Sequence, residues 1–398
     1  MQQKAVVIGA GIGGLAAALA LHLRGWQVAV HERAASLDPV GSGLGIAPNA
    51  LRALDVLGAG DEVRALAGLH GEAALRRPSG RRLAAAGQEA IARAYGDPVV
   101  AVHRADLVAA LHRRLPPGTV RTGSPAALAD PGDARRPARV TAGGTEGEAD
   151  LVVAADGLRS AARALLLPGH PGPRYSGFTT WRTVVPDPGR PVPAGETWGR
   201  GALTGVIPLT GGRVYLYAAA LTPPGGRAAD GDERAELLRR YGGWHRGLVD
   251  LLHSADPAAV LRHDVWELAD PLPALHGGRV ALLGDAAHAM TPFQGQGACQ
   301  ALEDAVVLAH ALAGADVTGA LAAYTAARLP RTTAVTAGSR RVGRLVGLRA
   351  APAVALRDTL LAAAGRLPER TAVRAAASLL DWRPPAERTA RPAAGQPR

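Results

Sequence analysis

The first stretch of the chain constrains its fold more than any other part of the sequence. Residues 5–32 read AVVIGAGIGGLAAALALHLRGWQVAVHE. The apolar run at 5–8 predicts a buried strand, and a second strand is expected at 27–31. Between them, residues 15–23 are nearly all Ala and Leu, which favour a helix that Gly25 closes. A strand, a helix and a strand in this order form the first unit of an α/β nucleotide-binding fold.

Three glycines and an acid complete this unit. Gly9, Gly11 and Gly14 match G-x-G-x-x-G, and Glu32 ends the second strand. The first glycine allows a sharp turn, the second lets a pyrophosphate approach the backbone, and the third lets the helix pack closely on the strand. A carboxylate at Glu32 can accept hydrogen bonds from a ribose diol. The pattern predicts a site for an ADP moiety without distinguishing NAD from FAD. The alternative is a glycine-rich turn in a domain that binds no nucleotide.

The chain is strongly basic, but the distribution of its charge argues against nucleic acid. The formal net charge is +11, and Lys4 is the only lysine among 45 basic residues. The arginines are spread along the chain without interleaved aromatic residues, so we expect no nucleic-acid partner. Cys299 is the only cysteine, which excludes an intrachain disulfide and fits a reducing compartment. We expect no secretory signal and no membrane span, and therefore a cytoplasmic protein without a membrane partner.

Two further apolar runs, at 151–155 and 279–283, extend the nucleotide-binding sheet. Residues 174–270 alternate Thr, Val, Tyr and Trp, which predicts a mainly β region with one helix near 230–253. A helix is also expected from Pro48 through Leu57, capped by Asn49. The predicted fold class is α/β: a Rossmann-like domain interleaved with a mainly β substrate domain, with a helical C-terminus. The expected boundaries are 1–72, 98–173 and 276–340 for the nucleotide domain, 73–97 and 174–275 for the β-sheet domain, 341–382 for the C-terminal helices and 383–398 for a loose tail.

The two later strands end in similar dipeptides. Asp156-Gly157 follows one strand and Gly284-Asp285 follows the other. Ligands gather outside the carboxyl ends of parallel strands, so three such ends suggest one long ligand that crosses them. Taken singly, Asp156 and Asp285 could each be a helix cap instead. An NAD-only domain would leave both dipeptides without a role.

At this point the chain resembles a known family. VVIGAGIGGL with Glu32-Arg33, HRADL with Arg104, AADGLRS, and GRVALLGDAAHAMTPFQGQGACQALEDA occur in the order and spacing of the single-component FAD-dependent aromatic hydroxylases. These monooxygenases are similar to p-hydroxybenzoate hydroxylase. GLGIAPNALRALDVLG and TTWRTVV resemble the salicylate and urate hydroxylase branch in particular. The resemblance covers residues 5–345.

The resemblance implies a cofactor site and a reaction. The implied FAD contacts are Gly9, Gly11, Gly14, Glu32, Arg33, Gly45, Arg104, Asp156, Gly157, Asp285, Gly295, Gln296, Gly297 and Ala298. NADPH or NADH would reduce the FAD, and reaction with O₂ would give a flavin C4a-hydroperoxide that hydroxylates an aromatic or polycyclic molecule. No metal is expected, and His288 is expected to be structural. The implied oligomeric state is a monomer or a homodimer.

The substrate pocket is expected where the β-sheet domain meets the loop at 292–297. Pro292 and Phe293 would lie beside the flavin, and the sheet side would supply Trp181, Arg182, Trp198, Tyr215 and Tyr217. Tyr215 matches an active-site tyrosine of the urate hydroxylases, and Arg182 could pair with a substrate carboxylate. The alternatives are ordinary sheet tyrosines and a surface arginine. Leu203 falls near the position where those relatives carry a substrate-orienting arginine, which argues against urate. Aromatic residues make up only 4% of the chain, few for a pocket that binds small phenols, which favours a larger and more apolar substrate.

Two other functions stay open at this point. The same flavin chemistry could transfer oxygen to an alkene or a heteroatom of a natural product or antibiotic. A protein of another class would bind flavin as a sensor without turnover.

Overall fold

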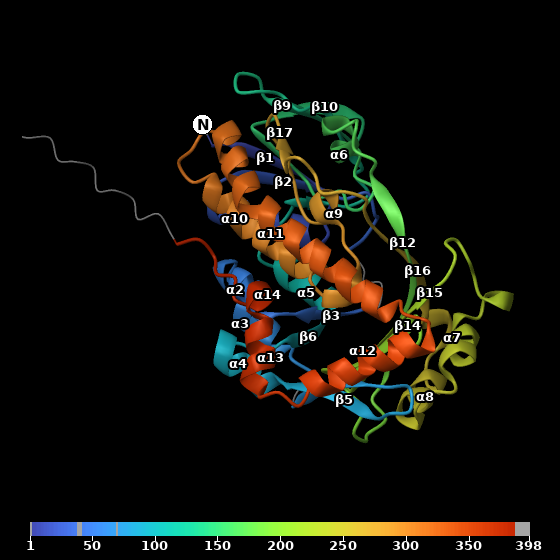
Figure 1. Cartoon of the computed structure of the whole chain (residues 1–398). Coiled ribbons are helices and arrows are strands. Elements are labelled where there is room, and N and C mark those ends of the chain that lie inside the picture. Colours follow the sequence, from blue (N-terminus) through green and yellow to red (C-terminus); the bar gives the residue numbers. More distant parts are fainter. Residues whose placement is uncertain (1, 38–41, 69–70, 387–398) are drawn as a thin grey trace, which may run out of the picture.

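The computed structural model describes residues 2–37, 42–68 and 71–386 (Figure 1). Its first layer is a six-stranded sheet in the order β17-β18-β11-β1-β2-β7. All neighbours in it are parallel except β17 and β18. The strands are β1 (Lys4–Ile8), β2 (Gln27–His31), β7 (Val120–Arg121), β11 (Leu151–Ala154), β17 (His276–Gly277) and β18 (Val280–Leu282). The four strands expected from apolar runs are present. The two-residue strands β7 and β17 were not expected, because they are too short for a periodic signal.

The second layer is a seven-stranded sheet in the order β16-β12-β15-β14-β13-β4-β5. Only the β13–β4 pair is parallel. Its strands are β4 (Glu72–Arg76), β5 (Arg82–Gly87), β12 (Pro173–Pro186), β13 (Gly195–Trp198), β14 (Ala202–Leu209), β15 (Arg213–Leu221) and β16 (Leu261–Leu268). Two helices, α7 (Glu233–Tyr241) and α8 (Arg246–His253), cover one face. The single helix expected near 230–253 is therefore wrong, because Gly242 and Gly243 interrupt it.

Smaller elements lie beside the two sheets. Three antiparallel strands form a separate sheet, and β3 pairs with β6. These strands are β3 (Gly43–Ile46), β6 (Val100–His103), β8 (Ala126–Asp130), β9 (Ala138–Ala142) and β10 (Thr145–Ala149). The short helices are α2 (Pro48–Val56), α3 (Gly60–Ala65), α4 (Gln88–Tyr95), α5 (Arg104–His112), α6 (Ala161–Leu166) and α9 (Asp285–His288), with turns η1 (Ala229–Gly231), η2 (Pro257–Ala259) and η3 (Pro292–Gln294). Ala47, not Asn49, is the N-cap of α2, since Pro48 occupies the first helical position.

Helices cover the first sheet and cross to the second. They are α1 (Ile12–Leu23), α10 (Gly297–Ala311), α11 (Val317–Val346), α12 (Ala351–Ala364), α13 (Glu369–Ala375) and α14 (Ala377–Leu380). Figure 1 shows α11 running from the six-stranded sheet toward the seven-stranded sheet, with α12 returning below it. The boundary expected at 340–341 falls inside α11, so the helix continues across it. Most of the tail expected at 383–398 lies outside the described residues.

The hydrophobic core is divided by the sheets. The largest cluster surrounds the six-stranded sheet and includes α1 and α10. A second cluster lies between the seven-stranded sheet and the pair α7 and α8. The opposite face of that sheet packs against η3, α11 and α12 through Phe178, Trp198, Leu203, Phe293 and Val346. This last interface brings the two layers together.

Candidate active site

The glycine loop after β1 has the geometry that close packing and ligand approach require. Gly9 has a φ of +101°, which favours glycine. A Cβ at Gly14 would overlap the carbonyl oxygen of Gly9, so the third glycine is required for packing of α1. A Cβ at Gly11 would meet no atom within 4 Å. The space beside Gly11 is therefore open, at the N-terminus of a helix whose N–H groups favour anions.

Glu32 supports this loop from the neighbouring strand. Its Oε2 accepts a hydrogen bond from the Ala10 N–H at 2.8 Å, and its Oε1 accepts one from the Ala34 N–H at 2.9 Å. Each oxygen retains a lone pair for a further donor such as a ribose hydroxyl. Arg33 is exposed next to it and makes no hydrogen bond or ion pair in the described part of the chain.

The two acidic dipeptides at the strand ends present carboxylates with unused acceptor capacity. Asp156 Oδ2 accepts from the Ala162 N–H in the first turn of α6 at 3.1 Å, although Asp156 is not the N-cap residue of that helix. Its Oδ1 is buried without a partner in the described residues, while Ser160 is the N-cap of α6. Asp285 is exposed between buried neighbours and has no hydrogen bond in that same part of the chain. Both carboxylates can accept hydrogen bonds from a ligand at this sheet edge.

The loop before α10 is a second backbone cradle. Gly295 has a φ of +63°, and a Cβ there or at Gly297 would meet no atom within 4 Å. Gln296 is the N-cap of α10 but makes no side-chain capping bond, and Ala298 lies in the first turn. The free N–H groups of this turn form a positive dipole end next to open space. Such an end stabilises a negative charge placed against it.

A buried polar network positions this helix end. Gln296 Oε1 accepts from Asn49 Nδ2 and from Gln300 Nε2, both at 3.1 Å. Asn49 Nδ2 also donates to Glu303 Oε1 at 2.7 Å, so α2 is joined to α10. This explains why Asn49 does not cap its own helix: its side chain points into the core.

Arg328 of α11 is the centre of the network and is fully buried. It donates to Asp304 Oδ1 at 2.7 Å, to Glu303 Oε2 at 2.5 Å and to Gln300 Oε1 at 2.8 Å. The charges of His288 and Arg328, together with their hydrogen bonds to Asp304, hold the pKa of Asp304 at about 2 against the desolvation that would raise it. Sequence reasoning missed Arg328, because its partners lie on another helix.

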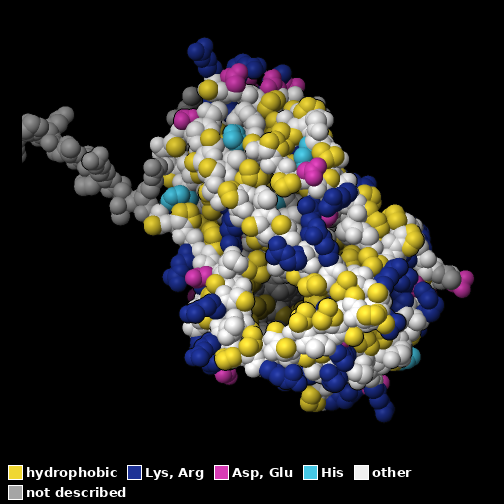
Figure 2. Space-filling view, in the orientation of Figure 1, with side chains coloured by type: hydrophobic (Ala, Val, Ile, Leu, Met, Phe, Trp, Pro, Cys, Tyr) yellow, Lys and Arg dark blue, Asp and Glu magenta, His cyan; other side chains and the backbone are white. Residues whose placement is uncertain are grey.

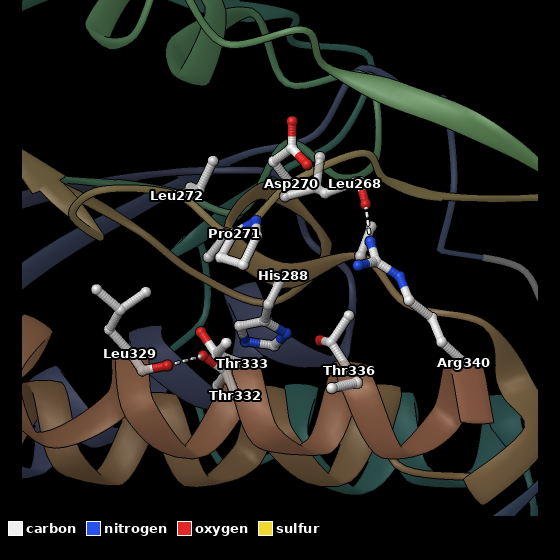
Figure 3. Close-up of a pocket in the computed structure, with 13 residues that line it drawn as sticks. Leu268, Asp270, Pro271, Leu272, His288, Leu329, Thr332, Thr333, Thr336 and Arg340 are labelled. Atoms are coloured by element: carbon white, nitrogen blue, oxygen red, sulfur yellow. Dashed lines mark hydrogen bonds between the residues drawn. The ribbon is translucent and has the colours of Figure 1, made fainter. Parts of the chain in front are cut away.

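His288 faces this network rather than the glycine loops. Its Nε2 lies 2.6 Å from Asp304 Oδ2. Figure 3 shows the ring in a small pocket between the α9 segment and α11, with Thr332, Thr333 and Thr336 along the helix side. The position agrees with a structural role. Among the described residues, no group of three His, Cys, Asp or Glu side chains could hold a metal ion.

The other two expected cofactor contacts lie between the layers. Gly45 is in β3, and its carbonyl oxygen lies 3.6 Å from Cys299 Sγ on α10. Arg104 begins α5, is exposed, and donates its backbone N–H to the Ser42 carbonyl at 2.9 Å. A Cβ at Gly43 would lie 2.5 Å from the Tyr215 ring, so β3 rests directly on the seven-stranded sheet.

One face of the seven-stranded sheet carries the two tyrosines. Tyr215 and Tyr217 stack with ring centroids 5.5 Å apart. The Tyr217 hydroxyl donates to Glu196 Oε1 at 2.7 Å, and Trp198 Nε1 donates to Glu196 Oε2 at 2.7 Å. Burial raises the pKa of the Glu196 carboxyl above its ordinary value. The Tyr217 hydroxyl is thus already bound to Glu196. Glu196 was not identified from the sequence as a residue of this site.

Tyr215 has a different environment from Tyr217. Its hydroxyl makes no hydrogen bond in the part of the chain that the structure describes, and burial raises its pKa to about 12. Arg182 pairs with Tyr217 in the register of β12 and β15, and its charge acts on Tyr215. The Arg182 guanidinium likewise makes no ion pair or hydrogen bond within the described ranges. Tyr215 therefore remains a neutral donor at neutral pH.

Trp181 points the other way, which corrects the expectation that it lines the pocket. Neighbouring residues of a strand point to opposite faces, so Trp181 and Arg182 cannot share one. The Trp181 side chain is fully buried beneath α7 and α8. Its Nε1 donates to Glu233 Oε2 at 2.7 Å, and the Arg240 guanidinium lies 5.2 Å from its ring.

Pro292 and Phe293 form η3, which lies where the layer of the six-stranded sheet meets the tyrosine-bearing face of the seven-stranded sheet. The Phe293 ring packs edge-on against Phe178 with centroids 4.8 Å apart. A Cβ at Gly343 of α11 would lie 2.8 Å from the Phe293 ring, so α11 also lies against it. Figure 2 shows a deep hollow with a hydrophobic rim on the face where Figure 1 places β3, β6 and α12. Phe293 thus joins η3, α11 and the face of the seven-stranded sheet that carries Tyr217.

The residues present fit FAD. Open space beside three glycines, two helix N-termini and two carboxylates with unused acceptors suit a pyrophosphate, a ribityl chain and a polar ring edge. The fold and this site define a flavoprotein similar to p-hydroxybenzoate hydroxylase. The model of the FAD binding domain family matches residues 2–339, and the chain belongs to this family of FAD-dependent monooxygenases.

Individual relatives cover most of the chain. The aurachin C monooxygenase/isomerase of Stigmatella aurantiaca is 38% identical over 343 residues, which cover 85% of this chain and 88% of the relative. The FAD-dependent urate hydroxylase of Klebsiella pneumoniae is 34% identical over 82% of this chain and 86% of its own length. The solved structure of HpxO from Klebsiella pneumoniae with FAD and uric acid has a TM-score of 0.84 at 28% identity, covering 94% of this chain and 95% of that one.

Within the described ranges, no helix is both long and apolar enough to cross a membrane.

Proposed function

We propose that this protein hydroxylates an aromatic or polycyclic small molecule, with NADPH or NADH and O₂ as co-substrates. The observation that carries the proposal is the meeting of the glycine cradle before α10 with the sheet face that presents Tyr215. Bound FAD would supply the hydride acceptor and the activation of O₂. The protein would act in the cytoplasm as a monomer or a homodimer.

The chain itself would hold and orient the reactants. The open backbone beside Gly11 and Gly297 suits the phosphate and ring-edge ends of the cofactor, and Asp285 suits its hydroxyl groups. The first turn of α10 favours negative charge on the ring edge. Phe293 and the apolar cluster behind it would exclude water from the reacting atoms.

The sheet face favours an apolar substrate with one acidic or hydroxyl group. Leu203 and Trp198 give the wall an apolar character. The Tyr215 hydroxyl and the Arg182 guanidinium have no other partner in the described part of the chain, so they can bind a phenol oxygen or a carboxylate. The apolar wall favours a less polar substrate than urate.

The alternative is oxygen transfer to an alkene or a heteroatom of a natural product, with the same binding groups. A sensor without turnover would not need the unpaired Tyr215 and Arg182 beside an apolar wall. The mass and structure of the product would distinguish the two reactions.

The test is anaerobic reduction of the bound flavin by NADPH or NADH, with and without a panel of phenols, aromatic acids and quinolones. A compound that accelerates reduction, followed in air by a product heavier by one oxygen, supports the proposal. Fast reduction without any compound, or consumption of O₂ without an oxygenated product, contradicts it.

Tyr215→Phe should lower kcat/KM for that compound at least tenfold, about 1.4 kcal/mol, because one hydrogen bond to substrate is lost. Tyr241→Phe removes the same group on the other face, where the hydroxyl donates to the Ala219 carbonyl. That control should retain wild-type kinetics. Equal kinetics for the two variants would exclude Tyr215 from substrate binding.

A further inference from the structure

Helix α12 is inverted relative to an ordinary surface helix. Its charged residues Arg357 and Asp358 are 4% and 5% exposed, whereas Leu356 and Leu360 are 61% and 60% exposed. A surface helix normally turns its apolar stripe toward the core and its charges toward water. Leu356 and Leu360 are therefore not part of the core, whereas Leu361 of the same helix packs against it.

The buried charges hold α12 firmly in this orientation. Arg357 Nη1 donates to the Gly199 and Leu345 carbonyls, each at 3.1 Å, and Arg357 Nη2 pairs with Asp358 Oδ1 at 2.8 Å. Asp358 Oδ2 also pairs with Arg77 Nε at 2.8 Å. Rotating the helix to bury the leucines would break all of these contacts. The exposed face is thus fixed by the fold.

The exposed face of α12 carries no charge along its whole length. The face, which we call the α12 surface, consists of Ala351, Pro352, Ala355, Leu356, Thr359, Leu360, Ala363 and Ala364. Leu345 near the end of α11 and Leu367 shortly after α12 are a further 40% and 54% exposed. Patches of exposed leucines of this kind mark interaction sites.

Arginines flank this surface at both ends. Between residues 341 and 376, all of which the structure describes, the exposed charged side chains are six arginines and one glutamate: Arg341, Arg344, Arg349, Arg366, Arg370, Arg374 and Glu369. Glu369 already lies 3.7 Å from Arg93. Figure 2 shows hydrophobic side chains gathered over α12 with Lys and Arg side chains around them.

This charge pattern favours one kind of binding partner for the α12 surface over another. In a two-fold dimer with antiparallel α12 helices, the arginines at one end would face those at the other end of the second copy, at a cost in repulsion. An anionic lipid surface would accept the leucines among its acyl chains and the arginines among its headgroups. We propose that the α12 surface docks the protein on an anionic membrane surface. This revises the expectation of no membrane partner, without any membrane-spanning segment.

The docking surface has a consequence for substrate access. The hollow in Figure 2 lies on the same face of the molecule as α12 in Figure 1. A docked protein would therefore turn the mouth of the hollow toward the lipid, so that a membrane-dissolved aromatic molecule could enter without crossing water. This part rests on the proposed function, whereas docking itself does not.

The test is co-sedimentation of the full-length FAD-bound protein with phosphatidylcholine vesicles, with and without phosphatidylglycerol. Substrate and NADPH are left out, so that a failure of the proposed reaction cannot affect the result. The variant is Leu356→Glu with Leu360→Glu, and the control is Leu23→Glu on α1, since Leu23 is 56% exposed outside this surface. Retained flavin absorbance shows that each variant is folded.

We expect the wild type and the control to bind phosphatidylglycerol vesicles at least tenfold better than neutral ones, and the double variant to lose at least tenfold. Binding should weaken as salt is added. A wild type that stays in the supernatant, or a double variant that binds as well as wild type, overturns the proposal. Light scattering that shows a wild-type dimer and a monomeric double variant would also overturn it, in favour of a second copy.

Discussion

The same added methyl group should have different effects at Gly11 and Gly14 of the nucleotide loop: it should weaken FAD binding at Gly11 and lower the stability of the fold at Gly14. In Gly14→Ala the Cβ would overlap the Gly9 carbonyl oxygen and lie 3.3 Å from Ala155 Cβ. Backbone atoms cannot rotate away as side chains can, so α1 must shift from β1. Overpacking of this kind costs about 1–3 kcal/mol, and we expect the upper end because the clash is with backbone.

Gly11→Ala meets open space instead. The backbone at Gly11 has a φ of −67° and a ψ of 177°, which any residue adopts. A small loss as a helix cap and a small gain from a stiffer unfolded chain should nearly cancel. The methyl group would occupy the approach of a pyrophosphate to the backbone. Loss of one or two charge-assisted hydrogen bonds, about 1.5 kcal/mol each, weakens FAD binding about ten- to hundredfold.

The assay separates the two effects. Urea unfolding of the FAD-free proteins should show a loss of stability for Gly14→Ala and little change for Gly11→Ala. Titration with FAD, followed by flavin fluorescence, should show the weakened binding of Gly11→Ala. If Gly11→Ala binds FAD as tightly as wild type, the open space is not the path of the ligand. If Gly14→Ala unfolds at the wild-type urea concentration, helix packing does not require this glycine.

Three further predictions concern the buried acids and Asp285. Arg328→Met should lower the free energy of unfolding by about 3–5 kcal/mol, because Asp304 loses its buried arginine. The control Arg246→Met, at a side chain that is 93% exposed, should change the free energy of unfolding little. Equal urea midpoints for the two variants would contradict this prediction. The raised pKa of Glu196 means that its protonation stabilises the folded state fully below the unfolded-state pKa and that this stabilisation is lost as pH rises through the folded-state pKa. Because Gln stays neutral, the stability of Glu196→Gln relative to wild type should rise as pH increases above the ordinary pKa range of glutamate, and a difference independent of pH would refute the argument. Asp285→Ala should release FAD more readily in equilibrium dialysis, and retention equal to wild type would remove Asp285 from the cofactor site.

The parts of the site that depend on local chain geometry could be predicted from the sequence. The glycine loop, Glu32 and the acids at the strand ends each lie within a few residues of the strand that positions them. Arg328 could not be predicted, since its partners on α10 come together only when the two helices pack. Nothing local distinguishes a buried arginine from the many exposed ones. The wrong prediction that Trp181 lines the pocket was avoidable, because strand alternation alone places Trp181 and Arg182 on opposite faces of the sheet.

Helix α11 extends past the last residue that the family model matches, so the matched part of the chain and the folded unit do not end at the same residue. The family match ends at residue 339, yet α11 continues unbroken to Val346. Beyond that point Gly343 packs on Phe293 and Val346 on the cluster with Phe178. A shortened chain ended at the match would retain every cofactor contact named above but leave that aromatic cluster open to water. Flavin retention alone would therefore be a poor criterion for a minimal active fragment.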